Sequence, residues 1–170
     1  MRKEIENAVA PLRGKALWRC SRAAEMATFD FGQRRASVNW KGEPREVGEL
    51  ALHVQCAWRI VRKDRVFVGS RDLYYPAEYR DGDVVPDNFD WEQYPNRRDR
   101  LLASLFRTGT RQFTVSEVEV GTAGSLRIIL SYDLSLDLFP HDSLSEEHWR
   151  LFEPDKEGPH FVVTGRGIET

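Results

Sequence analysis

Strict alternation of apolar and polar residues over two stretches constrains the fold of this chain more than any other feature. The longer stretch is apolar at Leu126, Ile128, Leu130, Tyr132, Leu134, Leu136 and Leu138. The other is apolar at Leu50, Leu52, Val54, Cys56, Trp58 and Ile60. A period of two puts such side chains on one face of a strand, whereas a helix would scatter them around its circumference. Each stretch therefore predicts one long strand with a buried face and a more polar face.

Two shorter segments have the periodicity of helices. In the first, Ile5, Val9 and Leu12 share one apolar stripe. In the second, Asn96 predicts an N-cap before an apolar stripe, and Gly109 predicts the C-terminal end of the helix. Weaker strand patterns occupy residues 27–31, 36–40, 66–68, 113–120, 149–152 and 160–164. The 36–40 pattern is expected to be the hairpin partner of the 27–31 pattern.

The order of these elements predicts an α+β protein. Most strands have no helix between them, which excludes the crossover connections that a parallel sheet needs. We expect a mainly antiparallel sheet of about seven or eight strands, strongly twisted or partly barrel-like, with two helices. The length of 170 residues suits a single domain over 1–170.

Charge and hydropathy exclude several classes of protein. The chain has 25 basic and 27 acidic residues, for a net charge of −2, and nonspecific binding of nucleic acid needs a net basic face. No apolar run approaches the roughly 20 residues of a transmembrane helix, and the first residues lack the apolar core of a secretory signal. We therefore expect a cytoplasmic protein without a membrane partner, in which Cys20 and Cys56 remain free thiols.

No sequence motif for catalysis or metal binding stands out. The chain has no G-x-S-x-G nucleophile turn and no glycine-rich phosphate loop ahead of a helix. The four histidines, His53, His141, His148 and His160, do not form the closely spaced pairs of a zinc site. His53 and Cys56 lie three apart on the predicted strand and would face opposite sides. We expect no metal ion and no cofactor, and a non-enzymatic protein is favoured over an enzyme.

Residues 70–95 have no periodic pattern but are rich in aromatic side chains. Structureless connections longer than about 12–15 residues are usually functional or disordered, and aromatic residues argue against disorder. Tyrosine, tryptophan and arginine dominate the energetics of protein interfaces. The alternative is that the rings pack over one end of the sheet. The predicted contact residues are Tyr74, Tyr75, Tyr79, Trp91, Tyr94, Arg97 and Arg98.

A second hypothesis is a small-molecule site, catalytic or not, on a concave face of the sheet. The polar faces of the two long strands carry His53, Gln55 and Arg59 on one and Asp133 and Asp137 on the other. The two aspartates would lie roughly 13 Å apart along one strand, too far to act together as an acid–base pair. The alternative is that both faces are solvated outer surfaces.

A third hypothesis is a nucleic-acid accessory factor. Five arginines follow residue 96, and two aromatic residues before them could stack on bases. The residues are Trp91, Tyr94, Arg97, Arg98, Arg100, Arg107 and Arg111. Acidic residues lie among them and cancel much of the positive field, so we do not expect nucleic acid to be the partner.

Three stretches together are similar to a known family. They are RAAEM at 22–26 leading to FDFG at 29–32, ALHVQCAWR at 51–59, and HFVVTG at 160–165. They resemble a family of small uncharacterised bacterial proteins, a domain of unknown function, over most of the chain. The resemblance implies kinship but no activity, so it assigns no functional residue, although it draws attention to His53, Gln55 and Arg59.

Taken together, the sequence favours a non-enzymatic bacterial interaction protein. Small bacterial proteins without a catalytic motif are often immunity-like proteins or accessory subunits, an argument by association. In this hypothesis the aromatic loop is the contact surface and a protein is the partner, while a small-molecule ligand is the alternative.

Overall fold

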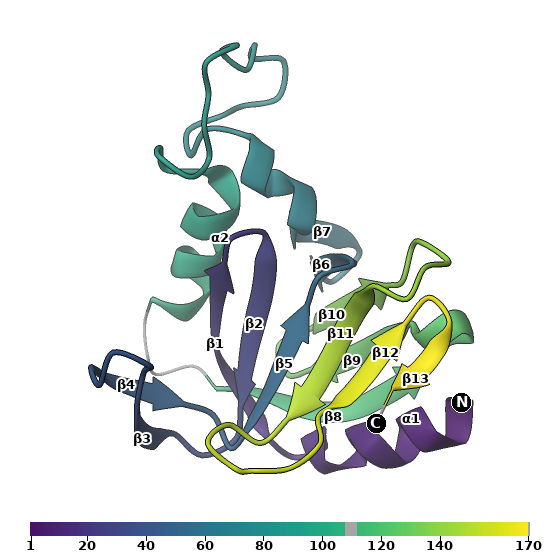
Figure 1. Ribbon diagram of the computed structural model, residues 1–170. Helices are drawn as coiled ribbons and strands as arrows, with labels where there is room; N and C mark the ends of the chain where they lie inside the picture. The colour runs from purple at the N-terminus through teal and green to yellow at the C-terminus, as the bar shows by residue number, and fades with distance from the viewer. Residues whose placement is uncertain (108–111, 170) are drawn as a thin grey trace.

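The computed structural model describes residues 1–107 and 112–169, and its centre is one sheet of 11 strands (Figure 1). The strands lie in the order β13-β12-β11-β5-β2-β1-β8-β9-β10-β6-β7, and neighbours run antiparallel. Their bounds are β1 (Ala16–Ala23), β2 (Met26–Phe31), β5 (Leu50–Val54), β6 (Ala57–Arg62), β7 (Arg65–Gly69), β8 (Phe113–Val120), β9 (Leu126–Leu130), β10 (Leu134–Phe139), β11 (Glu147–Phe152), β12 (Phe161–Thr164) and β13 (Gly167–Glu169). A separate hairpin pairs β3 (Arg35–Val38) with β4 (Pro44–Val47).

The predicted α+β class, the two helices and the antiparallel sheet are confirmed. The predicted number of seven or eight strands is wrong, because the sheet has 11, and the sheet is not closed into a barrel. The sequence patterns missed β1, β4 and β13, each of which has few fully buried residues to reveal an alternation. The predicted pairing of 36–40 with 27–31 is also wrong, since β3 pairs with β4 while β2 lies between β1 and β5.

The sheet folds over so that its two halves face each other. One half runs from β13 to β1 and the other from β8 to β7, and a short pairing between β1 and β8 joins them. Phe29 of β2 packs edge-on against Trp58 of β6, with ring centroids 5.2 Å apart. The indole N–H of Trp149 in β11 donates to the carbonyl of Gly124 at 2.8 Å, again between the halves. One cluster of buried apolar side chains fills the space between them.

The stretch from Leu50 to Ile60 forms two strands instead of the one that its alternation predicted. β5 and β6 belong to opposite halves of the sheet, and Gln55 and Cys56 form the bend between them. All six alternating apolar residues are nevertheless buried. The bend keeps the same side of the chain turned inward, so the alternation continues through it and gives no sign of it.

The stretch from 126 to 138 likewise forms a hairpin, β9–β10, rather than one strand. Its turn contains Tyr132 and Asp133, whose φ angles are 63° and 55°. Tyr132 is the exception to the predicted burial, at 58 % exposed, while the other six apolar positions are buried. Because Tyr132 is apolar although it lies in the turn, the alternation continues through the turn, and the sequence pattern does not indicate that the chain reverses there.

Both helices lie where the sequence predicted them. α1 (Arg2–Val9) continues into the 3-10 turn η1 (Ala10–Leu12) and packs against β8 and the 3-10 turn η3 (Thr122–Gly124). α2 (Arg97–Phe106) packs against β1, β7 and the 3-10 turn η2 (Ser70–Tyr74). The side-chain oxygen of Asn96 accepts from the N–H of Asp99 at 2.9 Å, which confirms the N-cap. The predicted helix end at Gly109 and the basic residue Arg111 lie outside the described residues. No helix in the described part of the chain has the length and apolar character needed to cross a bilayer.

Residues 77–95 form a projecting loop between η2 and α2, and Figure 1 shows it extending away from the sheet. An antiparallel bridge between Pro76 and Asn96 closes its base. The N–H of Ala77 donates to the carbonyl of Pro95 at 2.9 Å, and the N–H of Arg97 donates to the carbonyl of Tyr75 at 2.8 Å. The two stems are thus held side by side where the loop leaves the body of the protein.

Candidate ligand-binding pocket

The aromatic residues predicted as a contact surface pack largely against one another. The rings of Tyr75 and Tyr79 lie 4.7 Å apart, and those of Tyr74 and Trp91 lie 6.4 Å apart. Tyr74 is 38 % exposed and Tyr94 is 52 % exposed, whereas Trp91 is half-buried. Of the predicted aromatic set, Tyr94 therefore offers most surface to a partner.

The two arginines of the predicted contact set have different surroundings. Arg97 pairs through Nε with Asp72 at 3.2 Å and donates to the carbonyl of Tyr79 at 3.0 Å. Arg98 is only 1 % exposed, so from this position it does not reach a protein partner on the surface. Both arginines are therefore engaged within the protein, and neither adds a free exposed charge to the basic face that the nucleic-acid hypothesis requires.

The five polar residues of the predicted concave site are not brought together. His53 lies on the outer face of β5, where its Nδ1 accepts from Nε of Arg150 at 3.3 Å. Gln55 is in the bend, and Asp133 is in the turn of the β9–β10 hairpin. The two breaks in the predicted long strands are the physical reason, because they send the polar positions to different parts of the surface.

Arg59 and Asp137 do meet, on the outer face of the second half of the sheet. Asp137 is 4 % exposed, and its carboxylate lies 3.0 Å from Nε of Arg59 and 3.6 Å from Nε of Arg127. The hydroxyl of Ser135 also donates to it at 3.3 Å. With two guanidinium groups and a hydroxyl, the carboxylate has the partners that a buried charge needs.

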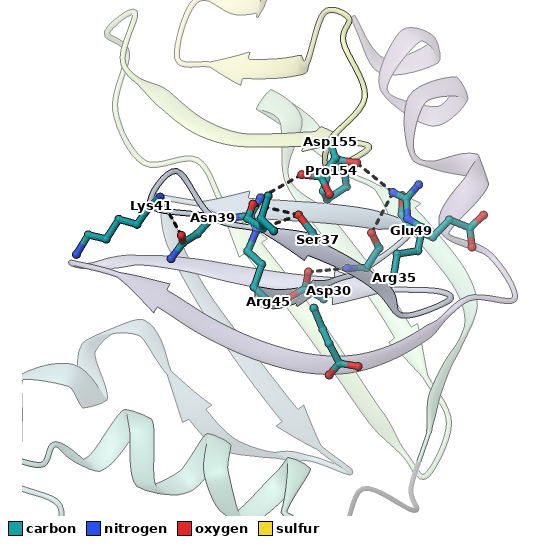
Figure 2. A network of polar contacts seen from close by, with 12 residues as sticks. Asp30, Arg35, Ser37, Asn39, Lys41, Arg45, Glu49, Pro154 and Asp155 are labelled. Carbon is teal, nitrogen blue, oxygen red and sulfur yellow. Dashed lines mark hydrogen bonds and ion pairs between the residues drawn. The ribbon is translucent and has the colours of Figure 1, made fainter. Parts of the chain in front are cut away.

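A second polar network ties the β3–β4 hairpin to the segment after β11 (Figure 2). Nη2 of Arg35 donates to the carbonyls of Gly48 at 3.3 Å and Pro154 at 3.1 Å. Arg45 pairs with Asp155 at 3.2 Å. These contacts are directed at backbone and at each other, so the network secures a surface hairpin.

A pocket of about 250 Å³ opens at one end of the folded sheet. It lies where the bend between β5 and β6 meets η2, α2 and the turn between β1 and β2. Its lining residues are Glu25, Gln55, Cys56, Ala57, Trp58, Ser70, Arg71, Leu73, Tyr74, Arg98 and His141. Three of these, Gln55, Tyr74 and Arg98, come from the two separate sites predicted from the sequence. The others come from distant parts of the chain, so only the fold could assemble them.

Arg98 is the most unusual residue of this pocket. Its Nη1 donates to the carbonyl of Glu25 at 3.0 Å, and its Nε lies 3.8 Å from the carboxylate of Asp99. Its Nη2 is buried and has no hydrogen-bond partner among the described residues. Burial lowers the pKa of this guanidinium, and the nearby Asp99 opposes that shift. The residue thus carries a charge whose hydrogen-bonding capacity is only partly used.

The remaining polar groups of the pocket set its chemistry. The hydroxyl of Tyr74 donates to the Glu25 carboxylate at 2.7 Å, and this hydrogen bond raises the pKa of Tyr74. Burial raises the pKa of Cys56 to about 12, so its thiol is not an activated nucleophile. The pocket therefore provides hydrogen bonds and charges for binding, and its cysteine does not provide a reactive thiolate.

A group of metal-ligating side chains adjoins the pocket through His141. The donor atoms of His141, Asp142 and His148 all lie within 4.8 Å of one another. This group was not predicted from the sequence, because His141 and His148 are seven residues apart in a segment without a known ligand spacing. His148 lies close to His141 and Asp142 because the chain turns back after Asp142 and enters β11.

Comparison of the chain with protein-family models, with curated proteins and with solved structures finds no match. The family resemblance of the three sequence stretches therefore stays a prediction.

Proposed function

We propose that this protein binds a small carboxylate-bearing molecule in the pocket at the end of the folded sheet. The observation that carries the proposal is the buried guanidinium of Arg98, whose Nη2 has no hydrogen-bond partner within residues 1–107 and 112–169. A buried donor without a partner costs about 1–3 kcal/mol, and more when the group is charged. A ligand or an ordered water molecule can supply the missing acceptor, and the proposal is that a ligand does so here.

A carboxylate suits this position in charge. Its oxygen would accept a charge-assisted hydrogen bond from Nη2, since Nη1 already donates to Glu25 and Nε faces Asp99. Arg71 adds a second positive charge at the exposed side of the pocket, and Gln55 and Ser70 add neutral polar groups. The pocket volume of about 250 Å³ lies just below the usual range for ligand sites, about 300–1,000 Å³, which favours a small molecule.

Glu25 narrows the class of ligand further. It is the one carboxylate among the lining residues, and its side chain already accepts from Tyr74. A second negative charge on the ligand would be repelled by it, while an amine or hydroxyl would find an acceptor there. The preferred ligand is accordingly a monocarboxylate that also carries a hydrogen-bond donor, such as an amino or hydroxy acid.

The proposal is tested with a panel of small carboxylates, amino acids, hydroxy acids and inorganic phosphate, first by thermal shift and then by calorimetry. The critical variant is Arg98→Met. Replacing a buried, incompletely paired charge with an apolar side chain of similar volume is often neutral or stabilising, so the variant should melt no lower than the wild type. It should also lose at least about 10-fold in affinity for any ligand that the wild type binds.

The matched control is Arg100→Met on the same helix, because Arg100 is exposed and does not line the pocket. Its ligand affinity should equal that of the wild type. Binding that survives Arg98→Met, or an absence of binding across the whole panel, would contradict the proposal.

A second candidate function is the protein contact predicted from the sequence, and the projection of residues 77–95 from the body favours it (Figure 1). Val84 and Tyr94 are 88 % and 52 % exposed on this loop. A pull-down that compares the wild type with Tyr94→Ala tests it. A stoichiometric partner retained by the wild type and lost by the variant supports this function, and equal capture by both removes Tyr94 from it.

A further inference from the structure

His141, Asp142 and His148 converge at the end of β10 although the chain between them makes a loop. β10 ends at Phe139, His141 and Asp142 follow within three residues, and His148 is the second residue of β11. Nε2 of His148 lies 3.7 Å from Oδ1 of Asp142, and the two imidazole rings have centroids 5.6 Å apart. Two ligands on a tetrahedral zinc ion are about 3.4 Å apart, given bonds of about 2.1 Å. The His148–Asp142 pair is close to this spacing, and donor atoms up to 4.8 Å apart would have to approach by about 1.4 Å.

Backbone hydrogen bonds hold the main chain of His148 and the side chain of Asp142. The main-chain carbonyl of His148 accepts from the N–H groups of both Gln55 and Cys56, at 2.8 and 3.0 Å, which fixes the backbone of this residue to the β5–β6 bend. The carboxylate of Asp142 accepts from the N–H of Leu144 at 2.9 Å. The hydrogen bond to Asp142 is of the kind that orients ligating carboxylates in metal sites.

The turn between β12 and β13 adds a further constraint. Gly165 lies so close to the backbone of Asp142 and Leu144 that a side chain at this position would collide with it. The loop from Asp142 to Leu144 is therefore packed closely against Gly165.

The nitrogen atoms of the two histidines have weak partners that an ion could replace. Nδ1 of His141, an exposed residue, accepts a long hydrogen bond of 3.4 Å from the N–H of Ala57. Nε2 of His148 lies 3.2 Å from the carbonyl of Asp142. A metal ion at either nitrogen would exchange one such contact for a coordinate bond, with release of the proton where the nitrogen carries one.

We propose that His141, Asp142 and His148 form a binding site for a transition-metal ion, Zn²⁺ being the best match to their two imidazoles and one carboxylate. Three protein ligands leave a coordination position for water or another molecule. His148 is buried whereas His141 and Asp142 are exposed, so this position faces the solvent side of the group. His141 also lines the pocket described above, and the ion would stand in its wall.

The proposal is tested on the untagged full chain, stripped with a chelator and titrated with zinc chloride in competition with a chromogenic chelator. The wild type should bind one equivalent. His141→Ala and Asp142→Asn alter exposed residues and should leave the fold intact, and each should weaken binding by about 10- to 100-fold or more. Loading with Co²⁺ should give the intense visible absorption of a four-coordinate ion in the wild type and lose it in both variants.

The matched control is His160→Ala, which removes a histidine outside the group. Its affinity for zinc should equal that of the wild type. An absence of saturable zinc binding, or equal affinity in the wild type and His141→Ala, would overturn the proposal. Because the titration contains no carboxylate ligand, its outcome is independent of the proposal for Arg98.

Discussion

His53 shows how a single side chain can make the stability of this protein depend on pH. It lies on the outer face of β5, between the side chains of Arg150 and Phe152. Burial lowers its pKa from 6.5 to about 4, and the positive charge of Arg150 acts in the same direction. The folded protein therefore holds this histidine neutral under conditions in which the unfolded chain protonates it.

We predict that His53 destabilises the folded protein as the pH falls from about 6.5 to about 4. Above this window neither state binds the proton, and within it only the unfolded state does, so the free energy of unfolding decreases with decreasing pH. His53→Gln removes this contribution, and its loss of stability between pH 7 and pH 4.5 should be smaller than that of the wild type by about 2 kcal/mol. Chemical denaturation at the two pH values measures the difference. Equal losses in the two proteins would show that His53 titrates at an ordinary pKa.

At the scale of single elements, the turns decide where the strands end. Asp133 has a φ of 55° in the β9–β10 turn, and its carbonyl accepts from the N–H of Lys63 at 2.7 Å. Aspartate tolerates the left-handed region better than most residues, and a β-branched residue tolerates it poorly. The sequence around the turn thus contains a residue compatible with the reversal, although the alternation of apolar positions hides it.

We predict that Asp133→Val lowers the free energy of unfolding by about 1–2 kcal/mol, because valine is strained at this φ. Asp133→Gly should be as stable as the wild type or slightly more so, because glycine adopts this conformation freely. Asp64→Val is the control, since it removes a charge from the β6–β7 turn at a residue without a positive φ. Urea unfolding compares the three variants, and equal losses in Asp133→Val and Asp64→Val would argue against strain at 133.

These elements also show which features of the fold could be predicted from the sequence. Its periodicity identified the buried residues of β5, β6, β9 and β10 correctly, because a period of two depends only on which side of the chain faces the core. It could not locate the bend at Gln55 and Cys56, since that bend preserves the inward side. The pocket could not be predicted from the sequence for a related reason. Its lining residues come from segments as distant as Glu25 and His141, and no local sequence pattern indicates that these segments lie close together in the fold.

At the scale of the whole molecule, the two halves of the sheet are joined by their shared core. Trp149 in one half is completely buried and donates from Nε1 to the carbonyl of Gly124 on the other side, at 2.8 Å. A Cβ atom at Gly124 would lie 2.6 Å from a methyl group of Val163, so the halves approach each other closely at this point.

We predict that Trp149→Phe destabilises the protein by about 1–3 kcal/mol, because the carbonyl of Gly124 is left buried without its donor. Trp18→Phe is the matched control. The Nε1 atom of Trp18 is buried and has no partner in the part of the chain that the structure describes, so this substitution removes an indole but no hydrogen bond seen there. Its cost in guanidinium unfolding should be clearly smaller. A cost equal to that of Trp149→Phe would mean that lost ring volume, rather than the bond between the halves, accounts for both.

The closed base of the projecting loop determines how freely the length and sequence of this loop can vary. The bridge between Pro76 and Asn96 holds the two stems together. The two ends of the loop are therefore fixed next to each other. Closing a loop over such fixed ends becomes only slowly more costly as residues are added. The tip can therefore lengthen, shorten or exchange its sequence while the register of every strand stays as it is, which makes it the natural place for this scaffold to diversify.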